Sequence, residues 1–171
     1  NGELYNTEEL RKVLLDKGFS FEGYSDTEVL LYSYIYWGIS CLDHLNGIFA
    51  FAIYDESKQS LFLARDQLGV KPIFYALQGS SISFASEIKS ILANPSIKPI
   101  LNRDGLTELF ALGPATSLGS GILKGIKEIP PAHYAYVTKD NFLLKEYWKV
   151  EAEEFRESLS EAEEHLGYLL N

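Results

Sequence analysis

The sequence opens with Asn1 and Gly2, two residues that can together stabilise negative charge on an oxygen atom. The side-chain amide of Asn1 and the backbone N–H of Gly2 are two donors that can converge on one oxygen. Such a pair is an oxyanion hole, and an oxyanion hole serves a nucleophile that attacks a carbonyl group. The first question is therefore whether the chain also supplies the nucleophile.

Cys41 is the only thiol in the sequence, and His44 follows it three residues later. On a helix this spacing places both side chains on one face, where they could act as nucleophile and base. A single Cys among Ile39, Leu42 and Leu45 is more often a small core residue, and we favour that interpretation.

Charged residues at three other places could contact a ligand. Asp26 lies where a helix is expected to begin, so capping of the helix is favoured over binding of an ammonium group. Arg65 and Asp66 end an apolar run, and a buried ion pair that fixes a turn is favoured over contact with a ligand. Glu87 is expected in the first turn of a short helix.

Composition narrows the classes of partner. The 171 residues carry a net charge of -9, from 24 acidic and 15 basic residues, which argues against nucleic acid and anionic membrane surfaces as partners. No apolar run approaches the ~20 residues that span a bilayer. With a single Cys and no ligand-like spacing of His44, His133 and His165, the sequence predicts a cytoplasmic protein without a metal site. The absence of Met indicates a fragment or a processed chain.

Two helices are predicted near the start of the chain. The first lies between Asn6 and Gly18 and the second between Ser25 and Gly38. In each, the first residue and a Glu three positions later have the spacing of a capping box, and the Gly ends the helix. Shorter helices are predicted from Ser86 and from Asp104, and a last one is predicted to be capped by Ser160 and Glu163 and to carry Leu166, Leu169 and Leu170.

Strands are predicted in the middle of the chain. Residues 47–55 are apolar on both faces, which indicates a strand buried between two layers. This strand and three further runs, at 60–66, 72–77 and 81–86, are interpreted as an antiparallel meander. Residues 126–137 and 142–148 are predicted to form a late hairpin, after a loop at 114–125 that lacks the pattern of a phosphate-binding loop. Helices followed by strands and further helices favour an α+β layered fold.

The order of seven motifs resembles one family. "NGELYN", "SDTEV", "LNGIFAFAIYD", "LFLARDQLGVKPIFY", "FASEIKSIL", "IKEIPPAHY" and "EYW" look like the amino-terminal glutaminase domain of glutamine-hydrolysing asparagine synthetases, a class II glutamine amidotransferase. The resemblance covers residues 1–150, and residues 151–171 resemble the start of the synthetase domain that follows. Residues 49–75 are its most specific part, because other class II amidotransferases share the Asn-Gly loop and a motif like "DTEV".

The resemblance implies an N-terminal-nucleophile (Ntn) hydrolase fold, a four-layer α/β/β/α sandwich that is incomplete in this chain. It implies that a Cys at the processed amino terminus attacks the side-chain amide of glutamine, with its own α-amino group as proton carrier. Asn1 and Gly2 would form the oxyanion hole, Glu3 would lie beside the bound glutamine, and Asp26 would hold the α-amino group of glutamine. The ammonia would pass to the C-terminal synthetase domain of the same parent chain, which would use ATP and magnesium.

The sequence departs from the family at its first residue, because the amino-terminal Cys and the Arg segment behind it are absent. Cys41 has no free α-amino group, so we expect the chain alone to be inactive. The alternative hypothesis is a non-catalytic, glutamine-binding or regulatory pseudo-amidotransferase, and a purely structural interaction domain ranks last. Unpaired sheet edges are compatible with a homodimer. The sequence does not identify the acceptor of the ammonia.

Overall fold

The structure of the chain is a computed structural model that describes residues 1–113, 121–152 and 158–169. Residues 114–120 of the loop predicted at 114–125 lie outside these residues, as does Leu170. In chain order the elements are β1 (Gly2–Leu4), α1 (Thr7–Asp16), α2 (Asp26–Trp37), the 3₁₀ helix η1 (Gly38–Asp43), β2 (Gly47–Asp55), β3 (Ser60–Arg65), β4 (Phe74–Gln78), β5 (Ser81–Ala85), α3 (Ile88–Leu92), α4 (Arg103–Leu112), β6 (Ile126–Glu128), β7 (His133–Val137), β8 (Phe142–Glu146) and α5 (Leu159–Leu169).

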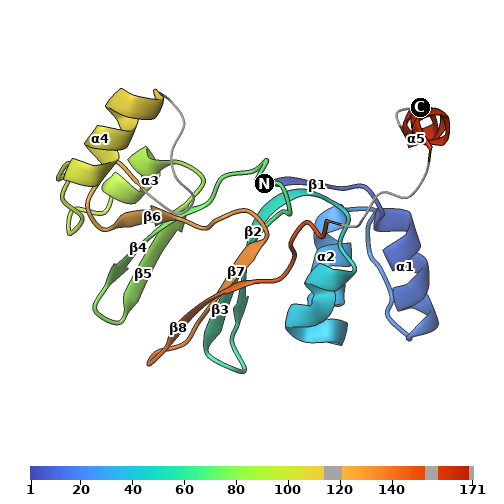
Figure 1. The fold of residues 1–171 in the computed structure, drawn as a ribbon. Coiled ribbons are helices and arrows are strands. Elements are labelled where there is room, and N and C mark those ends of the chain that lie inside the picture. The colour runs from blue at the N-terminus through green and yellow to red at the C-terminus, as the bar shows by residue number, and fades with distance from the viewer. Residues whose placement is uncertain (114–120, 153–157, 170–171) are drawn as a thin grey trace.

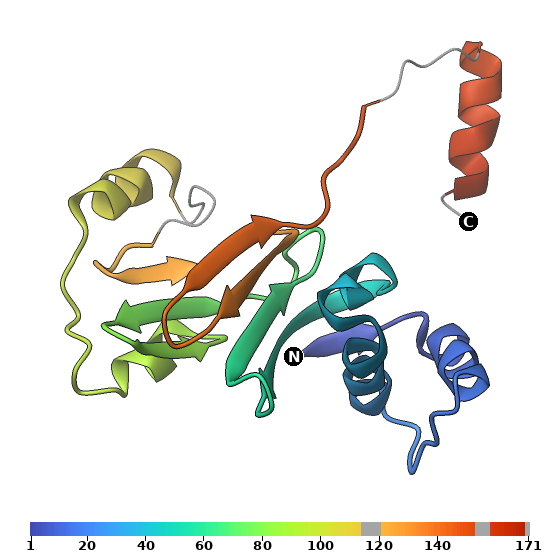
Figure 2. The ribbon, with the colours of Figure 1, turned by 90° about the horizontal axis from the view of Figure 1, so that it is seen from below.

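The elements from β1 to β8 are arranged in four layers, α/β/β/α, as Figure 1 shows, and α5 lies apart from them. Helices α1 and α2 cover a five-stranded sheet of order β1-β2-β3-β7-β8, and α3 and α4 lie beyond a three-stranded sheet of order β5-β4-β6. Figure 2 shows the same order of layers from below. Both sheets are antiparallel throughout. The predicted α+β class and its four-layer form are therefore confirmed.

Three apolar clusters fill the spaces between the layers. The cluster between the helices and the five-stranded sheet includes Leu14, Val29, Cys41 and Phe62, all fully buried. The second cluster lies between the two sheets, and its buried members are Ala50, Leu63, Ile73, Tyr75, Ile129 and Ala135. The third cluster lies between the three-stranded sheet and α3, and its buried members are Ala76, Ile91, Ile97 and Ile126. Each layer interface thus has its own core.

The predicted meander is wrong, because the strands belong to two different sheets. Strand β3 pairs with β2 and β7, whereas β4 pairs with β5 and β6. The chain crosses between the sheets after Asp66, whose carboxylate accepts hydrogen bonds from the backbone N–H groups of Leu68, Val70 and Lys71. These bonds turn the chain away from the five-stranded sheet, and no local sequence pattern specifies which sheet it enters next.

The late hairpin is confirmed only in its second half. Strands β7 and β8 pair from His133–Glu146 to Val137–Phe142, with the turn where it was predicted. Residues 126–137 are not one strand, because β6 ends at Glu128 and joins the other sheet. Pro130 and Pro131 have no backbone N–H, and Ala132 has a φ of 58°, so the chain cannot continue a regular ladder there.

Strand β2 has its predicted bounds, but only its first half is covered on both faces. Phe49 and Ala50 are buried, whereas Ala52 and Tyr54 are exposed. Phe49, Phe51 and Ile53 face the helices, and Ala50 faces the second sheet. The second sheet therefore covers the end of β2 near Phe49, where β1 also pairs with it.

The helix ends differ from the predicted capping boxes. Asn6 precedes α1, but its side chain bonds to His44 and Asn46 rather than to the helix. Ser25 caps α2 by accepting a hydrogen bond from Thr27 N, and Gly38 ends that helix with a φ of 62°. At the last helix the capping box is Ser158 with Glu161, two residues before the predicted pair. None of the residues of α5 that the structure describes is buried.

Candidate active site

Asn1, Gly2, Glu3 and Asp26, the four predicted site residues, line one small pocket. It has a volume of about 70 Å³ and lies between β1, the first turn of α2 and the start of β2. The remaining lining residues are Leu4, Thr27, Leu30, Phe49 and Phe51. The fold therefore brings together residues that are 23 or more positions apart in the sequence, with two carboxylates and an amide at an apolar wall.

The pairing of β1 with β2 directs the polar groups of Asn1 and Gly2. The backbone of Asn1 exchanges both hydrogen bonds with Ala50, at 3.2 and 2.8 Å. Because the bonds of an antiparallel pair alternate along the strand, the next residue, Gly2, directs its N–H away from β2. The ladder therefore leaves the Gly2 N–H available to an acceptor in the pocket.

Gly2 is required where it stands by the close approach of two strands. Its φ is 133°, and a Cβ atom there would lie 2.0 Å from the carbonyl oxygen of Ile48 and 2.7 Å from Cα of Phe49. Side chains other than Gly rarely adopt that φ. Any other residue would have to separate β1 from β2 and would move the neighbouring donors.

The side-chain amide of Asn1 is exposed and, among the residues that the structure describes, it has one long hydrogen bond. Its Nδ2 atom donates to Oγ of Ser86 at 3.5 Å, a distance at the limit of a hydrogen bond. Ser86 directly follows β5, so the second sheet contributes this contact. An amide held so weakly can donate to a ligand oxygen.

The first turn of α2 presents Asp26 to the pocket. Ser25 occupies the N-cap position and accepts the hydrogen bond from Thr27 N, so the interpretation of Asp26 as the cap is wrong. Asp26 is half-buried, and its carboxylate accepts a hydrogen bond from Thr27 Oγ1 at 3.3 Å. Its carboxylate and that of Glu3 make the pocket suited to a cationic group such as an ammonium.

Two residues that were not predicted to contribute to the site, Arg11 and Glu28, hold the loop before α2. Arg11 donates through Nη1 to the carbonyl oxygen of Gly23, and its guanidinium lies 4.2 Å from the ring centroid of Phe21. Glu28 accepts hydrogen bonds from the backbone N–H groups of Glu22 and Gly23. These contacts fix the approach to Asp26. An Arg on the apolar face of a predicted helix was the signal that could have identified the first of them.

The lining residues Phe49 and Phe51 were also missed as site residues. Both side chains lie on the face of β2 that packs against the helices. Their position in the pocket follows from the pairing of β1 with β2, in which Gly2 lies opposite Phe49. Long-range pairing of this kind leaves no signal near either residue.

Cys41 is a core residue, as the favoured interpretation predicted. Its side chain is fully buried, and burial, with a smaller contribution from Asp43, raises the pKa of the thiol to about 12. His44 instead stacks on Trp37, with ring centroids 4.2 Å apart. Cys41 therefore lacks both the exposure and the thiolate character of a nucleophile.

Arg65 and Asp66 fix a turn as predicted, but not as partners of each other. Arg65 forms its ion pair with Glu128, at 2.9 Å, and donates to the carbonyl oxygens of Gly69 and Lys71. Asp66 accepts from Phe49 N as well as from the turn, which connects the turn to the start of β2. Glu87 precedes α3 as its N-cap residue, without a capping bond, and pairs with Lys89.

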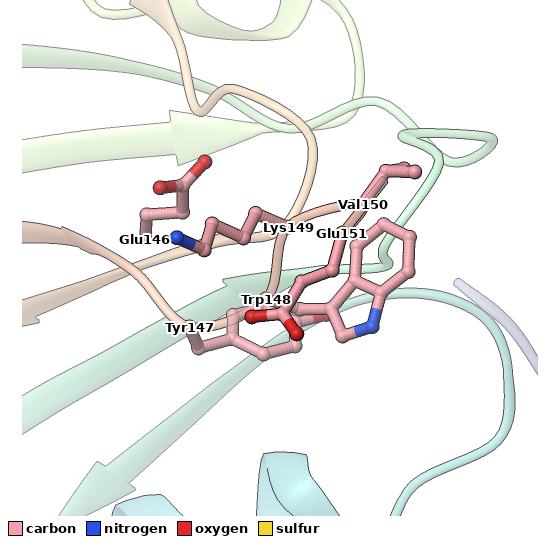
Figure 3. A pocket seen from close by; sticks show the side chains of 6 residues that line it. All are labelled: Glu146, Tyr147, Trp148, Lys149, Val150 and Glu151. Carbon is pink, nitrogen blue, oxygen red and sulfur yellow. The ribbon is translucent and has the colours of Figure 1, made fainter. Parts of the chain in front are cut away.

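A larger hollow, of about 710 Å³, contains none of the predicted site residues. It is lined by the six consecutive residues Glu146–Glu151, where the chain leaves β8. Figure 3 shows Trp148 and Val150 on one side of this segment and Glu146 with Lys149 on the other. One short segment cannot enclose a substrate, so we do not assign the reaction to this hollow.

Within the described ranges, no group of three or more His, Cys, Asp or Glu residues could hold a metal ion. Among the same residues, no helix has the length and apolar character needed to cross a membrane.

Comparisons with known proteins connect this geometry to one family. Residues 1–148 match the family described as a glutamine amidotransferase domain. Asparagine synthetase [glutamine-hydrolyzing] 3 of Bacillus subtilis is 58% identical over 161 residues, which are 94% of this chain and 26% of that protein. Amidase chyE of Penicillium rubens is 33% identical over 153 residues, 88% of this chain and 22% of that protein. The chain thus spans about a quarter of the length of these relatives.

A solved structure shares the fold. Glutamine phosphoribosylpyrophosphate amidotransferase of B. subtilis, in complex with ADP and GMP, superimposes with a TM-score of 0.59 at 22% identity. The match covers 86% of this chain and 28% of that one, and it confirms the Ntn-hydrolase fold. The family match spans both the pocket and the four layers that build it. The chain therefore belongs to the family of glutamine amidotransferase domains.

Proposed function

We propose that this chain is the glutaminase domain of an asparagine synthetase, which releases ammonia from glutamine for the amidation of aspartate. One observation carries the proposal: Asn1, Gly2, Glu3 and Asp26 line a single pocket. The similarity to asparagine synthetase 3 of B. subtilis supports the choice of aspartate as acceptor. The similarity to amidase chyE, at lower identity, indicates that domains of this kind also occur in proteins that are not named asparagine synthetases.

The residues of the pocket match the parts of the substrate. The carboxylate of Asp26 would accept the α-ammonium group of glutamine, with Glu3 beside it. The Asn1 side chain and the Gly2 N–H would donate to the amide oxygen as a nucleophile adds to the amide carbon. Phe49, Phe51 and Leu30 would contact the methylene groups of glutamine.

The nucleophile would come from a thiol outside residues 1–171. Cys41 is the only Cys in the sequence, and its side chain is fully buried. We therefore propose that the 171-residue chain alone does not hydrolyse glutamine, and that a Cys in the preceding part of the gene product does. The ammonia would pass to a C-terminal synthetase domain of the same polypeptide.

ATP and magnesium would belong to that synthetase domain. We propose no cofactor for residues 1–171, and a cytoplasmic location and a homodimer stay predictions. The domain boundary near residue 150 also stays a prediction.

The test is to measure glutamate released from glutamine by the complete gene product, with the 171-residue chain as control. We expect release from the complete product only. Release from the short chain would contradict the assignment of the nucleophile. A folded complete product that binds glutamine but releases no glutamate would support the pseudo-amidotransferase instead.

The acceptor needs a separate assay. With ATP, magnesium and glutamine present, the complete product should convert aspartate to asparagine. Glutamate release without asparagine formation would retain the glutaminase assignment and overturn the choice of aspartate.

A further inference from the structure

The turn between the two sheets holds two apolar side chains out into solvent. Leu68 is 74% exposed and Val70 is 52% exposed. Their backbone N–H groups both donate to Oδ1 of Asp66, at 3.1 and 2.9 Å. A buried carboxylate therefore holds the backbone that carries these two side chains, so the turn keeps them exposed in a fixed conformation.

Arg65 holds the same turn from its other side. Its guanidinium donates to the carbonyl oxygens of Gly69 at 2.7 Å and Lys71 at 2.9 Å, and it is itself buried. Gly69 has a φ of 68°, and a Cβ atom there would lie 2.6 Å from Pro131. The turn thus packs tightly on its inner side, while Leu68 and Val70 are held in solvent at fixed positions.

The segment that leaves the last sheet strand runs beside this turn. Tyr147 donates through its hydroxyl to the carbonyl oxygen of Arg65 at 2.8 Å and through its backbone to Ala132 at 2.9 Å. Ala132 N in turn donates to the carbonyl oxygen of Asp66. Trp148 and Val150 follow at 40% and 75% exposure and line the large open hollow shown in Figure 3.

We propose that Leu68, Val70, Trp148 and Val150, here called the exit patch, are the docking surface for the C-terminal domain of the same polypeptide. The proposal rests on the proposed function. The B. subtilis asparagine synthetase matches this chain over only 26% of its length, so about three quarters of that relative lies outside the match. The polypeptide leaves the sheet at the exit patch, so the part of the gene product that follows residue 150 starts from this surface.

The test compares the reactivity of single Cys substitutions in the complete gene product and in the 171-residue chain. Leu68→Cys and, independently, Val70→Cys are treated with a maleimide, and the modified position is identified by peptide mass spectrometry. Tyr54→Cys is the matched control, because Tyr54 is 60% exposed and lies near the end of β2 that is farther from the turn at Asp66. The side chains at positions 68 and 70 are exposed, so neither change removes a core contact.

We expect labelling at positions 68 and 70 to be slower by about tenfold or more in the complete product, with equal rates at position 54. A smaller difference at both positions would overturn the proposal. Protection that appears in the 171-residue chain as its concentration rises would assign the exit patch to a second copy and would also overturn it. Glutamate release by the unsubstituted complete product is measured separately, so failure of docking and failure of the glutaminase assignment are distinguishable.

Discussion

Replacing Gly2 with Ala tests whether the pairing of β1 with β2 positions the oxyanion hole. The new Cβ would lie 2.0 Å from the carbonyl oxygen of Ile48, whereas ordinary contact begins at 3.4 Å. Strand β1 must therefore move by roughly 1 Å or more, and a displacement of that size lowers catalytic rates by about 10²-fold. The φ of 133° adds strain of about 1–3 kcal/mol for any residue with a side chain.

Glutamate release by the complete gene product measures the first effect, and thermal unfolding measures the second. Gly79→Ala is the matched control, because Gly79 has a φ of 58° but no atom within 4 Å of the added Cβ. We expect Gly79→Ala to lower the free energy of unfolding by about 1 kcal/mol and to leave the activity unchanged. If Gly2→Ala retained the kcat of Gly79→Ala, the account of the oxyanion hole would be refuted.

Two further substitutions test the frame around the pocket. Asp66→Asn should leave the N–H groups of Phe49 and Lys71 facing an amide nitrogen. We expect this change to lower the free energy of unfolding, measured by urea denaturation, by roughly 2–6 kcal/mol. Asp140→Asn, at an exposed turn, is the control and should change this free energy little. If both variants unfolded at the same urea concentration, the role of Asp66 would be contradicted. The pKa of the Cys41 thiol is raised to about 12 by burial, so above pH ~8.5 the unfolded chain loses this proton before the folded chain does. Stability should therefore fall with rising pH by about 1.4 kcal/mol per unit more in the wild type than in Cys41→Ala, and parallel pH profiles would contradict this.

Local patterns were sufficient to predict most elements of the fold. The bounds of β2 follow from the apolar run at 47–55, and the end of α2 follows from the glycine at position 38, which stops a helix. The burial of Cys41 follows from its apolar neighbours. Each of these properties depends on residues that are close together in the chain, where sequence patterns are informative.

The partners of those elements could not be predicted in the same way. Two runs that follow each other in sequence, β3 and β4, belong to different sheets because Asp66 turns the chain between them. Asn6 has the type and spacing of a cap, but His44 and Asn46 offer its side chain better-placed partners. Tertiary contacts decided each outcome, and residue types alone do not reveal which contact prevails.

The candidate site was predicted mainly from the resemblance to a family. From the residues alone, a capping role was favoured for Asp26 over binding of an ammonium group, but the cap is Ser25, the other residue predicted for that helix end. Arg11 was missed, because its contact with Gly23 depends on the path of the loop that follows α1. The pocket itself depends on pairing between Gly2 and Phe49, which are 47 positions apart in the sequence.

The measurement that tests the central claim most directly is the steady-state kinetics of glutamate release by the complete gene product carrying Asn1→Ala or Asp26→Asn. The account predicts that Asn1→Ala lowers kcat by about 10²–10³-fold, because the amide donates to the oxygen that becomes charged in the transition state. It predicts that Asp26→Asn raises KM and largely retains kcat, because the ammonium group of glutamine is bound equally before and during the reaction. An Asn1→Ala enzyme with an unchanged kcat would contradict the account.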